Sequence, residues 1–360
     1  MIMYYKESQR LLYAFGQNAY GELGTGDVIE RNEPVIARLS SDLQIVQVAA
    51  GNELTLILTD ENDVYICGFF DTGPNSGLGI KKITELSGQK VSRIFVNNGC
   101  EHVVALTSLG KLWVFGYNTR GQLGLGNNSN ISSPTKLEFL ARKVVRTVGT
   151  SYYHTLIACE ELETYACGRN DSGQLGLGAS GDVLTPSLVE NLNGHMVISI
   201  GCGQHHSILA TAAGQVFACG KNENGQLGVI PHQTIVKKPL KVEGIEARQV
   251  ACGYYHTLAI GNDKKVYAWG KNDSGQLGLG DRGRILLPTP IEKLENVLQV
   301  ACGCYHSLVL TSIGLYAFGR NNHGQLGIKS NQNQIYPMLV IDLVTLRLTN
   351  RRKIIDKYNK

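Results

Sequence analysis

A short glycine-rich turn recurs along the whole chain and constrains the fold more than any other feature. Its two best copies are RNDSGQLGLG at 169–178 and KNDSGQLGLG at 271–280. The glycines that open the seven copies are Gly16, Gly68, Gly116, Gly168, Gly220, Gly270 and Gly319. They lie 48 to 52 residues apart, so the repeats account for nearly all of the 360 residues. A period of this length predicts a propeller, a solenoid or another array of repeats.

Each repeat contains four segments with the composition of β-strands. Residues 254–260 (YYHTLAI) and 265–269 (KVYAW), for example, are rich in β-branched and aromatic residues and flank a polar turn. Two further apolar runs, 286–291 and 297–300, precede the next such hairpin. Four-stranded units that bury their faces against neighbouring units predict an all-β fold, a seven-bladed β-propeller.

The two ends of the chain are predicted to share one blade. The segments that read as its strands are 2–5, 11–15, 337–343 and 346–348. We therefore expect residues 1–16 and 335–348 to form blade seven together, so that pairing of N-terminal strands with C-terminal strands closes the ring. The propeller is then a single domain of residues 1–348, and residues 349–360 form a basic C-terminal tail.

A histidine recurs in phase with the turn, three residues after a glycine or serine. The copies are His102, His154, His206, His256 and His306, and Leu54 takes the equivalent place in an earlier unit. One interpretation is a ring of ligands or proton relays. The other is one buried histidine per blade, bonded to a neighbouring backbone group, and five equivalent copies favour it. The turn residues that we expect to be structural in the same way are Gly173, Leu175, Gly275 and Leu277.

Composition argues against several classes of function. The charged fraction of 18% and net charge of +4 are not a nucleic-acid signature, and no apolar run is long enough for a membrane span. Most of the nine cysteines occupy equivalent places in different repeats, which predicts unpaired thiols in a cytoplasmic or nuclear compartment. Cys302 and Cys304 have no second ligand pair at zinc spacing, so we predict neither a metal nor a cofactor. No hydrolase motif is present, and the question of enzymatic activity stays open.

The clearest departure from the repeat is residues 69–82, FFDTGPNSGLGIKK. From Gly68 to Gly79 this turn takes eleven residues, where the regular turn from Gly16 to Gly24 takes eight. Exposed aromatic and charged side chains here would suit a protein contact, whereas a decayed turn would pack its phenylalanines inward. The candidate contact residues are Phe69, Phe70, Asp71, Asn75, Lys81 and Lys82.

The C-terminal tail is the second candidate for a contact. Arg351, Arg352 and Lys353 make it basic, which would suit DNA, an acidic tubulin tail or a nuclear import receptor. The alternative is a short solvated terminus.

The recurring G-x-N-x-x-G-Q-L-G turn and G-x-x-H-[ST]-x-x-L strand resemble the repeats of the regulator of chromosome condensation family. The resemblance covers residues 11–348 and implies a propeller. Members of this family include the nucleotide exchange factor for the GTPase Ran, tubulin-linked and ciliary proteins, ubiquitin-ligase modules and a plant ultraviolet receptor. That receptor senses light through clustered tryptophans. Here Tyr152–Tyr153, Tyr254–Tyr255 and Cys304–Tyr305 stand in those places, which disfavours photoreception.

Two classes of function follow from the resemblance. One is an interaction scaffold whose rim loops bind a protein, such as a cytoskeletal or ciliary assembly. The other is a guanine-nucleotide exchange factor for a Ran-like GTPase, which would act by binding the nucleotide-free GTPase most tightly. The family's exchange factor inserts an irregular loop against Ran. Residues 69–82 are similar in character but follow a different blade, and the sequence shows no N-terminal basic arm of the kind that factor uses on chromatin.

Overall fold

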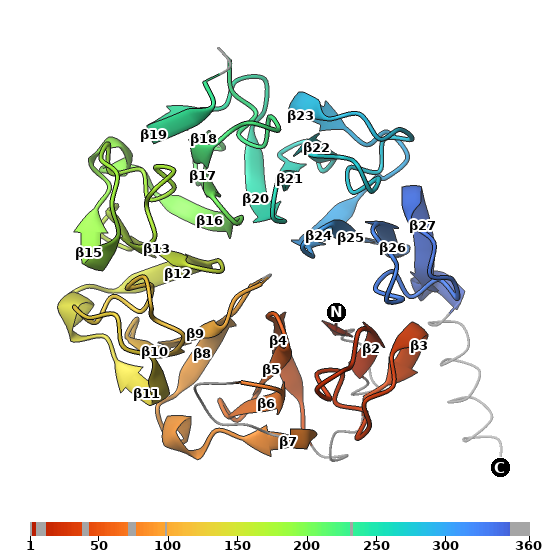
Figure 1. Ribbon diagram of the computed structural model, residues 1–360, viewed down its shortest axis with the longest axis horizontal. Coiled ribbons are helices and arrows are strands. Elements are labelled where there is room, and N and C mark those ends of the chain that lie inside the picture. The colour runs from red at the N-terminus through yellow and green to blue at the C-terminus, as the bar shows by residue number, and fades with distance from the viewer. Residues whose placement is uncertain are drawn as a thin grey trace.

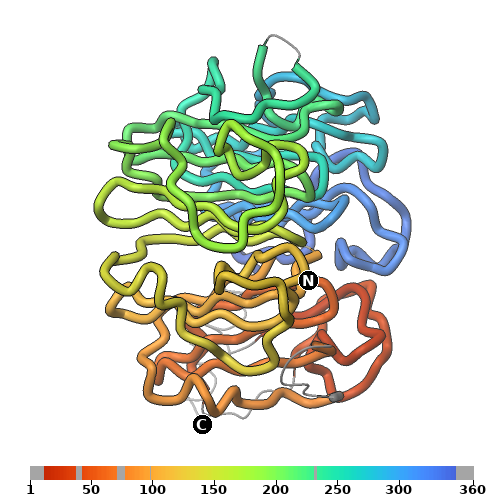
Figure 2. The backbone as a smooth tube through the Cα atoms, turned by 60° about the vertical axis from the view of Figure 1, so that its left-hand side comes forward, coloured from red at the N-terminus to blue at the C-terminus, as the bar shows by residue number. Residues whose placement is uncertain are grey.

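The computed structural model describes residues 2–4, 12–37, 43–70, 77–97, 99–230 and 233–345. In these residues the chain forms seven antiparallel sheets arranged around a common centre (Figure 1). Six sheets have four strands and the first has three. Turned by 60°, the backbone shows segments that follow one another in the chain lying next to one another, from red to blue (Figure 2). The fold is therefore an all-β propeller with four-stranded antiparallel blades, as the repeats predict.

We number the sheets first to seventh in chain order. The first three sheets consist of β1 (Ile2–Tyr4), β2 (Leu12–Gly16) and β3 (Arg31–Ile36); β4 (Ile45–Ala50), β5 (Leu54–Thr59), β6 (Val64–Gly68) and β7 (Gly77–Lys82); and β8 (Val91–Phe95), β9 (His102–Thr107), β10 (Leu112–Gly116) and β11 (Ile131–Lys136). The fourth and fifth consist of β12 (Val145–Thr150), β13 (His154–Cys159), β14 (Thr164–Gly168) and β15 (Val183–Leu188); and β16 (Val197–Cys202), β17 (His206–Thr211), β18 (Val216–Lys221) and β19 (Ile235–Lys241). The sixth and seventh consist of β20 (Ala247–Cys252), β21 (His256–Gly261), β22 (Val266–Gly270) and β23 (Ile285–Pro290); and β24 (Val297–Cys302), β25 (His306–Thr311), β26 (Gly314–Gly319) and β27 (Gln334–Asp342).

Burial explains the sequence pattern of the strands. The second strand of a blade, such as β5, is buried at all of its residues because neighbouring sheets cover both of its faces. The fourth strand, such as β11, lies at the outside and contains only partly buried and exposed residues. Short 3₁₀ helices η1 (Thr84–Leu86), η2 (Glu138–Leu140) and η3 (Glu190–Leu192) follow three of the fourth strands, and each buries its leucine.

The first strands of the second to seventh sheets lie nearest the centre and surround a cavity of about 410 Å³ (Figure 1). We call β4, β8, β12, β16, β20 and β24 the inner strands. The register of each inner strand shifts between its first and third residues, as between Val145 and Thr147 in β12. Such a bulge re-aims the side chains beside it. As a result, polar third residues such as Ser199 and Gln249 line the cavity.

The predicted sharing of a blade by the two ends of the chain is not found in the described strands. Residues 334–342 form β27, which pairs with β26, and the first sheet is β1, β2 and β3 alone. The reason is local: β27 follows β26 through one turn, and consecutive antiparallel strands pair most readily with each other. Of the segments assigned to the shared blade, 346–348 lies outside the described residues, as does the basic tail with Arg351, Arg352 and Lys353.

The first and seventh sheets nevertheless touch each other. Phe15 of β2 packs in one apolar cluster with Leu308 of β25 and Leu326. The Lys329 N–H donates to the carbonyl oxygen of Asn32 at 2.7 Å, and Nδ1 of His323 lies 2.9 Å from a carboxylate oxygen of Glu30. These contacts join segments some 290 residues apart in the chain.

Candidate partner-binding site

The repeated turn connects the third and fourth strands of a blade and is held by its own side chains. In the copy at 169–178, Oδ1 of Asn170 accepts from the Leu175 N–H at 3.1 Å, and Oε1 of Gln174 accepts from the Ser172 N–H at 2.9 Å. Leu175 is fully buried. Gly173 has a φ of +73°, and a Cβ there would lie 2.8 Å from the Cα of Lys237 in the next sheet. Gly275 and Leu277 repeat this arrangement in the sixth sheet, where the leucine is again buried and a Cβ on the glycine would meet Ile335.

Each buried histidine reaches across to the next sheet. Nε2 of His154 lies 2.9 Å from Oγ of Ser207, and that hydroxyl donates to the Gln174 carbonyl at 2.8 Å. Because the serine gives its only proton to the carbonyl, Nε2 of His154 must be the donor to Oγ. The equivalent pairs are His102 with Thr155, His206 with Thr257, and His256 with Ser307. The expected partner was a backbone group, and the observed one is a hydroxyl that is itself bonded to a turn carbonyl.

Burial keeps these histidines neutral. His102, His154, His206 and His256 are fully buried, and burial lowers the pKa of His102, His206 and His256 to about 3. Burial also lowers the pKa of His154 well below its ordinary value. A neutral imidazole that already donates to a fixed hydroxyl is a structural group, because it has no substrate within reach.

The glycine three residues before a histidine makes room for the imidazole. A Cβ on Gly253 would lie 2.0 Å from Cε1 of His256 and 2.7 Å from the carbonyl oxygen of Gly303. Gly203 stands in the same relation to His206. In the fourth sheet Ser151 occupies this place, and its hydroxyl bonds Nδ1 of His154 at 2.7 Å.

We predict that Gly253→Ala lowers the free energy of unfolding by about 3 kcal/mol, because the added methyl overlaps buried atoms that have no room to move. Urea unfolding followed by fluorescence measures the loss. Gly79→Ala is the matched control, since a Cβ on Gly79 meets nothing within 4 Å and its expected effect is within about 0.5 kcal/mol. Equal stability of the two variants would contradict the packing role of Gly253.

Between the second and third sheets, apolar packing takes the place of the hydrogen bonds from histidine to hydroxyl to carbonyl. Leu54 takes the place of the histidine, and Val103 takes the place of the hydroxyl. Phe70 is 3% exposed and meets Phe115 edge-on, with ring centroids 5.6 Å apart. All four side chains belong to one apolar cluster.

This packing changes the interpretation of residues 69–82. Phe70 points into the core, so it fills the place that the motif leucine fills elsewhere. The connection between β6 and β7 spans 69–76, compared with 117–130 between β10 and β11, so it is shorter than the regular turn and not longer. The turn length predicted from the sequence was wrong because it was counted to Gly79. Gly79 lies inside β7, and Gly77 is the residue that pairs with Gly68.

The other candidate contact residues of this segment are dispersed. Phe69 is half-buried, with its ring centroid 5.2 Å from that of Tyr20. Lys81 and Lys82 are exposed on β7, and Lys82 forms an ion pair with Asp63 at 2.6 Å. Asp71 and Asn75 lie outside the described residues.

A set of tyrosines gathers at the same face of the propeller as the repeated turns. They lie in the loops that join inner strands to second strands. The members are Tyr152, Tyr153, Tyr254, Tyr255 and Tyr305, and we call this surface the tyrosine face. All five side chains are half-buried. A Cβ on Gly99 would lie 2.4 Å from the hydroxyl of Tyr254 and 3.0 Å from the ring of Tyr152, so side chains of the fourth and sixth sheets meet the backbone of a third-sheet loop near the central cavity.

Cations from the turns lie over these rings. The guanidinium of Arg169 is 5.4 Å from the ring centroid of Tyr153, the ammonium of Lys271 is 5.6 Å from Tyr255, and the guanidinium of Arg320 is 5.7 Å from Tyr305. Such contacts hold both partners in place. Burial raises the pKa of Tyr152 to about 12 and raises that of Tyr305, so these phenols stay protonated.

One of the three cations differs from the others. Arg169 and Lys271 are each paired with an acid two residues on, at 2.5 Å to Asp171 and 3.1 Å to Asp273. Arg320 has Asn322 at that position and bonds its neutral side-chain oxygen at 2.8 Å. Arg320 is also exposed, so the tyrosine face carries a positive charge that no neighbouring acid in the repeat offsets.

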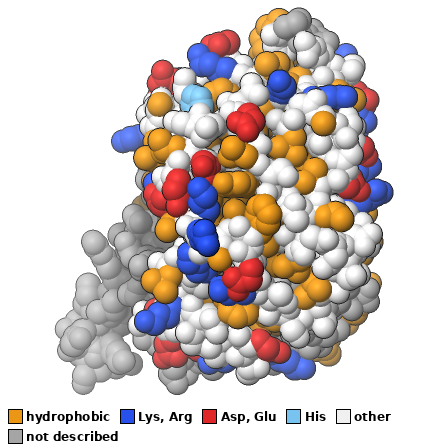
Figure 3. Space-filling model, turned by 90° about the vertical axis from the view of Figure 1, so that its left-hand side faces the viewer, with side chains coloured by type: hydrophobic (Ala, Val, Ile, Leu, Met, Phe, Trp, Pro, Cys, Tyr) orange, Lys and Arg blue, Asp and Glu red, His pale blue; other side chains and the backbone are white. Residues whose placement is uncertain are grey.

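The paired tyrosines that precede the motif histidines are visible in the sequence. There they argue against photoreception, but they do not predict a contact surface. Among the described residues, no group of three or more histidine, cysteine or acidic side chains is arranged to hold a metal, and no helix is long and apolar enough to cross a membrane. One outer side of the molecule shows charges of both signs interspersed with apolar side chains (Figure 3).

Comparison with known proteins identifies the family. The profile described as the RCC1-like domain matches residues 11–356. The ultraviolet-B receptor UVR8 of Arabidopsis thaliana is 31% identical over 223 residues, which cover 60% of this chain and 50% of the receptor, so the chain spans about half the length of this relative.

Two solved structures share the fold. Human WBSCR16 has a TM-score of 0.83 at 23% identity, covering 93% of this chain and 94% of that one. Prp20p of Saccharomyces cerevisiae, a yeast RCC1 studied for its binding to Gsp1p and histones, has a TM-score of 0.82 at 22% identity, covering 95% of this chain and 88% of that one. With its repeated turns, its stacked four-stranded sheets and a profile match over most of its length, this chain belongs to the family of RCC1-like domains.

Proposed function

We propose that this chain is a protein-interaction scaffold and that the tyrosine face is its main contact surface. The observation that carries the proposal is the set of half-buried tyrosines, each held by a neighbouring ring or cation, around the mouth of the cavity. Tyrosine and arginine are the side chains that most often dominate binding energy at protein interfaces. Rings already fixed by their neighbours lose little conformational entropy on binding.

The repeated turns supply the rim of this surface. They lie on the same face, and the connection between β6 and β7 is shorter than the repeated turns. Since Arg320 carries an unpaired positive charge beside Tyr305, the partner surface is expected to present an acidic side chain there. Rim loops and tyrosines together would then form one docking surface, with Phe69 at its edge.

We also infer that the seven sheets close into a ring through packing of the first sheet on the seventh. The apolar contacts of Phe15 and the hydrogen bond between Lys329 and Asn32 support this closure. A closed ring gives a scaffold with a fixed face, because no sheet is free to move against its neighbours.

The test places a photo-crosslinking amino acid at position 305 and, as a control, at Ile313, which is 54% exposed in the turn between β25 and β26 at the opposite face. We expect cell extract to yield a partner crosslinked from position 305 alone. Arg320→Glu should then weaken the purified complex about tenfold or more, while the charge-matched control Arg142→Glu leaves it unchanged. Crosslinks from Ile313 alone would reject the tyrosine face.

A second candidate function is nucleotide exchange on a Ran-like GTPase. The likeness in fold to Prp20p motivates it. An exchange factor needs only a shaped face that binds the nucleotide-free GTPase best, and the tyrosine face offers one. The assay measures release of fluorescent GDP from a Ran-type GTPase. Acceleration that Arg320→Glu diminishes and Arg142→Glu does not would establish exchange through this face, and unchanged release would reject exchange on Ran.

A further inference from the structure

The central cavity contains a charged side chain, that of Arg93, which lies outside the tyrosine face. Arg93 of β8 lines this cavity of about 410 Å³, and every other described residue that lines it is neutral. Small-molecule sites in proteins have volumes of this order. The cavity is therefore a candidate ligand site whose described lining carries a net positive charge.

Arg93 belongs to a layer of polar residues. The third residues of the inner strands all line the cavity at one register position, and they are Gln47, Arg93, Thr147, Ser199, Gln249 and Gln299. Several of these side chains bond the main chain of the next inner strand. Gln47 accepts from the Ile94 N–H at 2.9 Å, and Gln249 donates to the Val300 carbonyl at 3.3 Å. Arg93 is the one cation in this layer.

The guanidinium of Arg93 is only partly satisfied. Its Nη1 donates to the carbonyl oxygen of Arg146 at 3.2 Å, and its central carbon lies 4.9 Å from the ring centroid of Phe95. A guanidinium has five N–H donors, so most of them have no partner in the part of the chain that the structure describes. Other arginines have acidic partners: Arg31 pairs with Asp27, Arg120 with Asp182 and Arg169 with Asp171.

Protein atoms surround this charge, although the side chain is accessible from the cavity. Burial lowers the pKa of Arg93, and no acidic group among the described residues acts in the opposite direction. The group stays protonated nevertheless, because the pKa of an arginine lies far above neutrality. A cation that is partly withdrawn from water attracts an anion more strongly than one on the open surface does. An anion that enters the cavity would therefore be held at Arg93.

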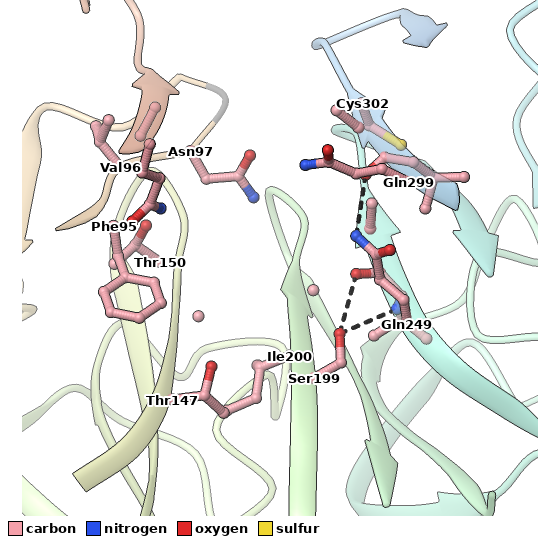
Figure 4. Close-up of a pocket in the computed structure, with 18 of the residues that line it drawn as sticks. Phe95, Val96, Asn97, Thr147, Thr150, Ser199, Ile200, Gln249, Gln299 and Cys302 are labelled. Carbon is pink, nitrogen blue, oxygen red and sulfur yellow. Dashed lines mark hydrogen bonds between the residues drawn. The ribbon is translucent and has the colours of Figure 1, made fainter. Parts of the chain in front are cut away.

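The cavity is narrowed at the tyrosine face. Asn97, which follows β8, donates from Nδ2 to the carbonyl oxygen of Cys202 in the fifth sheet at 3.4 Å. Figure 4 shows the side chains of Asn97 and Gln299 pointing toward each other from opposite walls of the cavity. Because the walls approach each other here, the cavity suits a small molecule better than a segment of a protein docked on the tyrosine face.

We propose that the central cavity binds a small organic monocarboxylate, whose carboxylate group pairs with Arg93. The planar guanidinium presents its N–H groups as a fork that matches the two oxygens of a carboxylate. One positive charge balances one negative charge, which favours a monocarboxylate over a phosphate dianion. The walls include Ala49, Val148, Ile200 and Leu310, so the rest of the ligand is expected to be apolar. This site does not depend on the proposed scaffold role.

The test uses the full chain and 4-fluorobenzoate, whose binding is followed by fluorine NMR. We expect a Kd of about 1 mM or below. The neutral analogue 4-fluorobenzamide, which has a similar shape without the charge, should bind about tenfold more weakly. Arg93→Gln should weaken the binding of 4-fluorobenzoate about tenfold or more, because the substitution removes the charged hydrogen bonds to the carboxylate.

Arg248→Gln is the matched control. Arg248 also lies in an inner strand and donates to a main-chain carbonyl of the next one, from Nη2 to Val297 at 2.7 Å. It does not line the cavity. Its replacement removes the same charge and a similar hydrogen bond, but it should leave the affinity for 4-fluorobenzoate unchanged. Thermal unfolding of both variants shows whether each retains the fold.

Other results would overturn the proposal. Absence of binding at about 10 mM 4-fluorobenzoate would show that the cavity takes no such ligand. Equal affinities of the two variants would place the probe elsewhere. Tighter binding of phenyl phosphate would assign Arg93 to a phosphate, and complete displacement of the probe by an equal concentration of sodium chloride would assign it to inorganic anions. Loss of partner binding in Arg93→Gln, with unchanged binding of the probe, would assign Arg93 to the partner.

Discussion

Lowering the pH from 7.5 to 5.5 should remove about 7 kcal/mol from the free energy of unfolding. The five histidines His102, His154, His206, His256 and His306 are neutral in the folded state, with a pKa of about 3 or a strongly lowered pKa. In the unfolded chain each titrates near its ordinary pKa of about 6.5. The unfolded state therefore binds more protons below pH 6.5, and stability falls as the pH falls, by about 1.4 kcal/mol per histidine over this range.

Urea unfolding at pH 7.5, 6.5 and 5.5 measures this dependence. The double variant His206→Leu/Thr257→Val copies the apolar pair Leu54 and Val103 that the chain itself uses between the second and third sheets. It should fold and should lose about a fifth of the pH-dependent part of the stability, because one of five titrating groups is gone. Equal stability at pH 7.5 and 5.5 would show that the histidines are accessible to protons in the folded state.

Phe70→Ala should lower the free energy of unfolding by about 4 kcal/mol. Its ring is buried against Phe115 and fills the place of the motif leucine, so truncation leaves a cavity between the second and third sheets. Neighbouring side chains are held in their sheets and cannot collapse into the space. Urea unfolding with an unchanged m-value would report this loss as a change in stability alone.

Phe69→Ala is the matched control, because it removes the same group one residue away. Phe69 is half-buried against Tyr20, and its truncation should cost about 1 kcal/mol. If Phe69 lies at the edge of the docking surface, the same change weakens partner binding while leaving the fold intact. A loss of less than 1 kcal/mol in the free energy of unfolding of Phe70→Ala would mean that its ring does not pack tightly between the second and third sheets.

Much of the fold could be predicted from the repeat alone. The spacing of the turns gave the number of units, and the alternation of apolar segments gave the strands, because both depend on contacts inside one unit. A structural role for His154 and Leu175 is also what the sequence favours, since residues that recur in most units are explained more simply by packing than by a single partner. Two predictions were wrong, both at places where the repeat is broken. The shift of the turn to Gly77 and the strand pairing of 334–342 depend on which residues hydrogen-bond, and the sequence pattern is ambiguous there.

The tyrosine face was beyond prediction for a different reason. Tyr152 and Tyr254 are a hundred residues apart in the sequence, and only the curvature of the ring brings both to Gly99. Likewise His154 lies within hydrogen-bond distance of Ser207 because two sheets stack in one register. The sequence by itself determined what each unit is, because local periodicity and burial act within about fifty residues. The tertiary structure alone decided which residues of different units meet, because the stacking of whole sheets sets those distances.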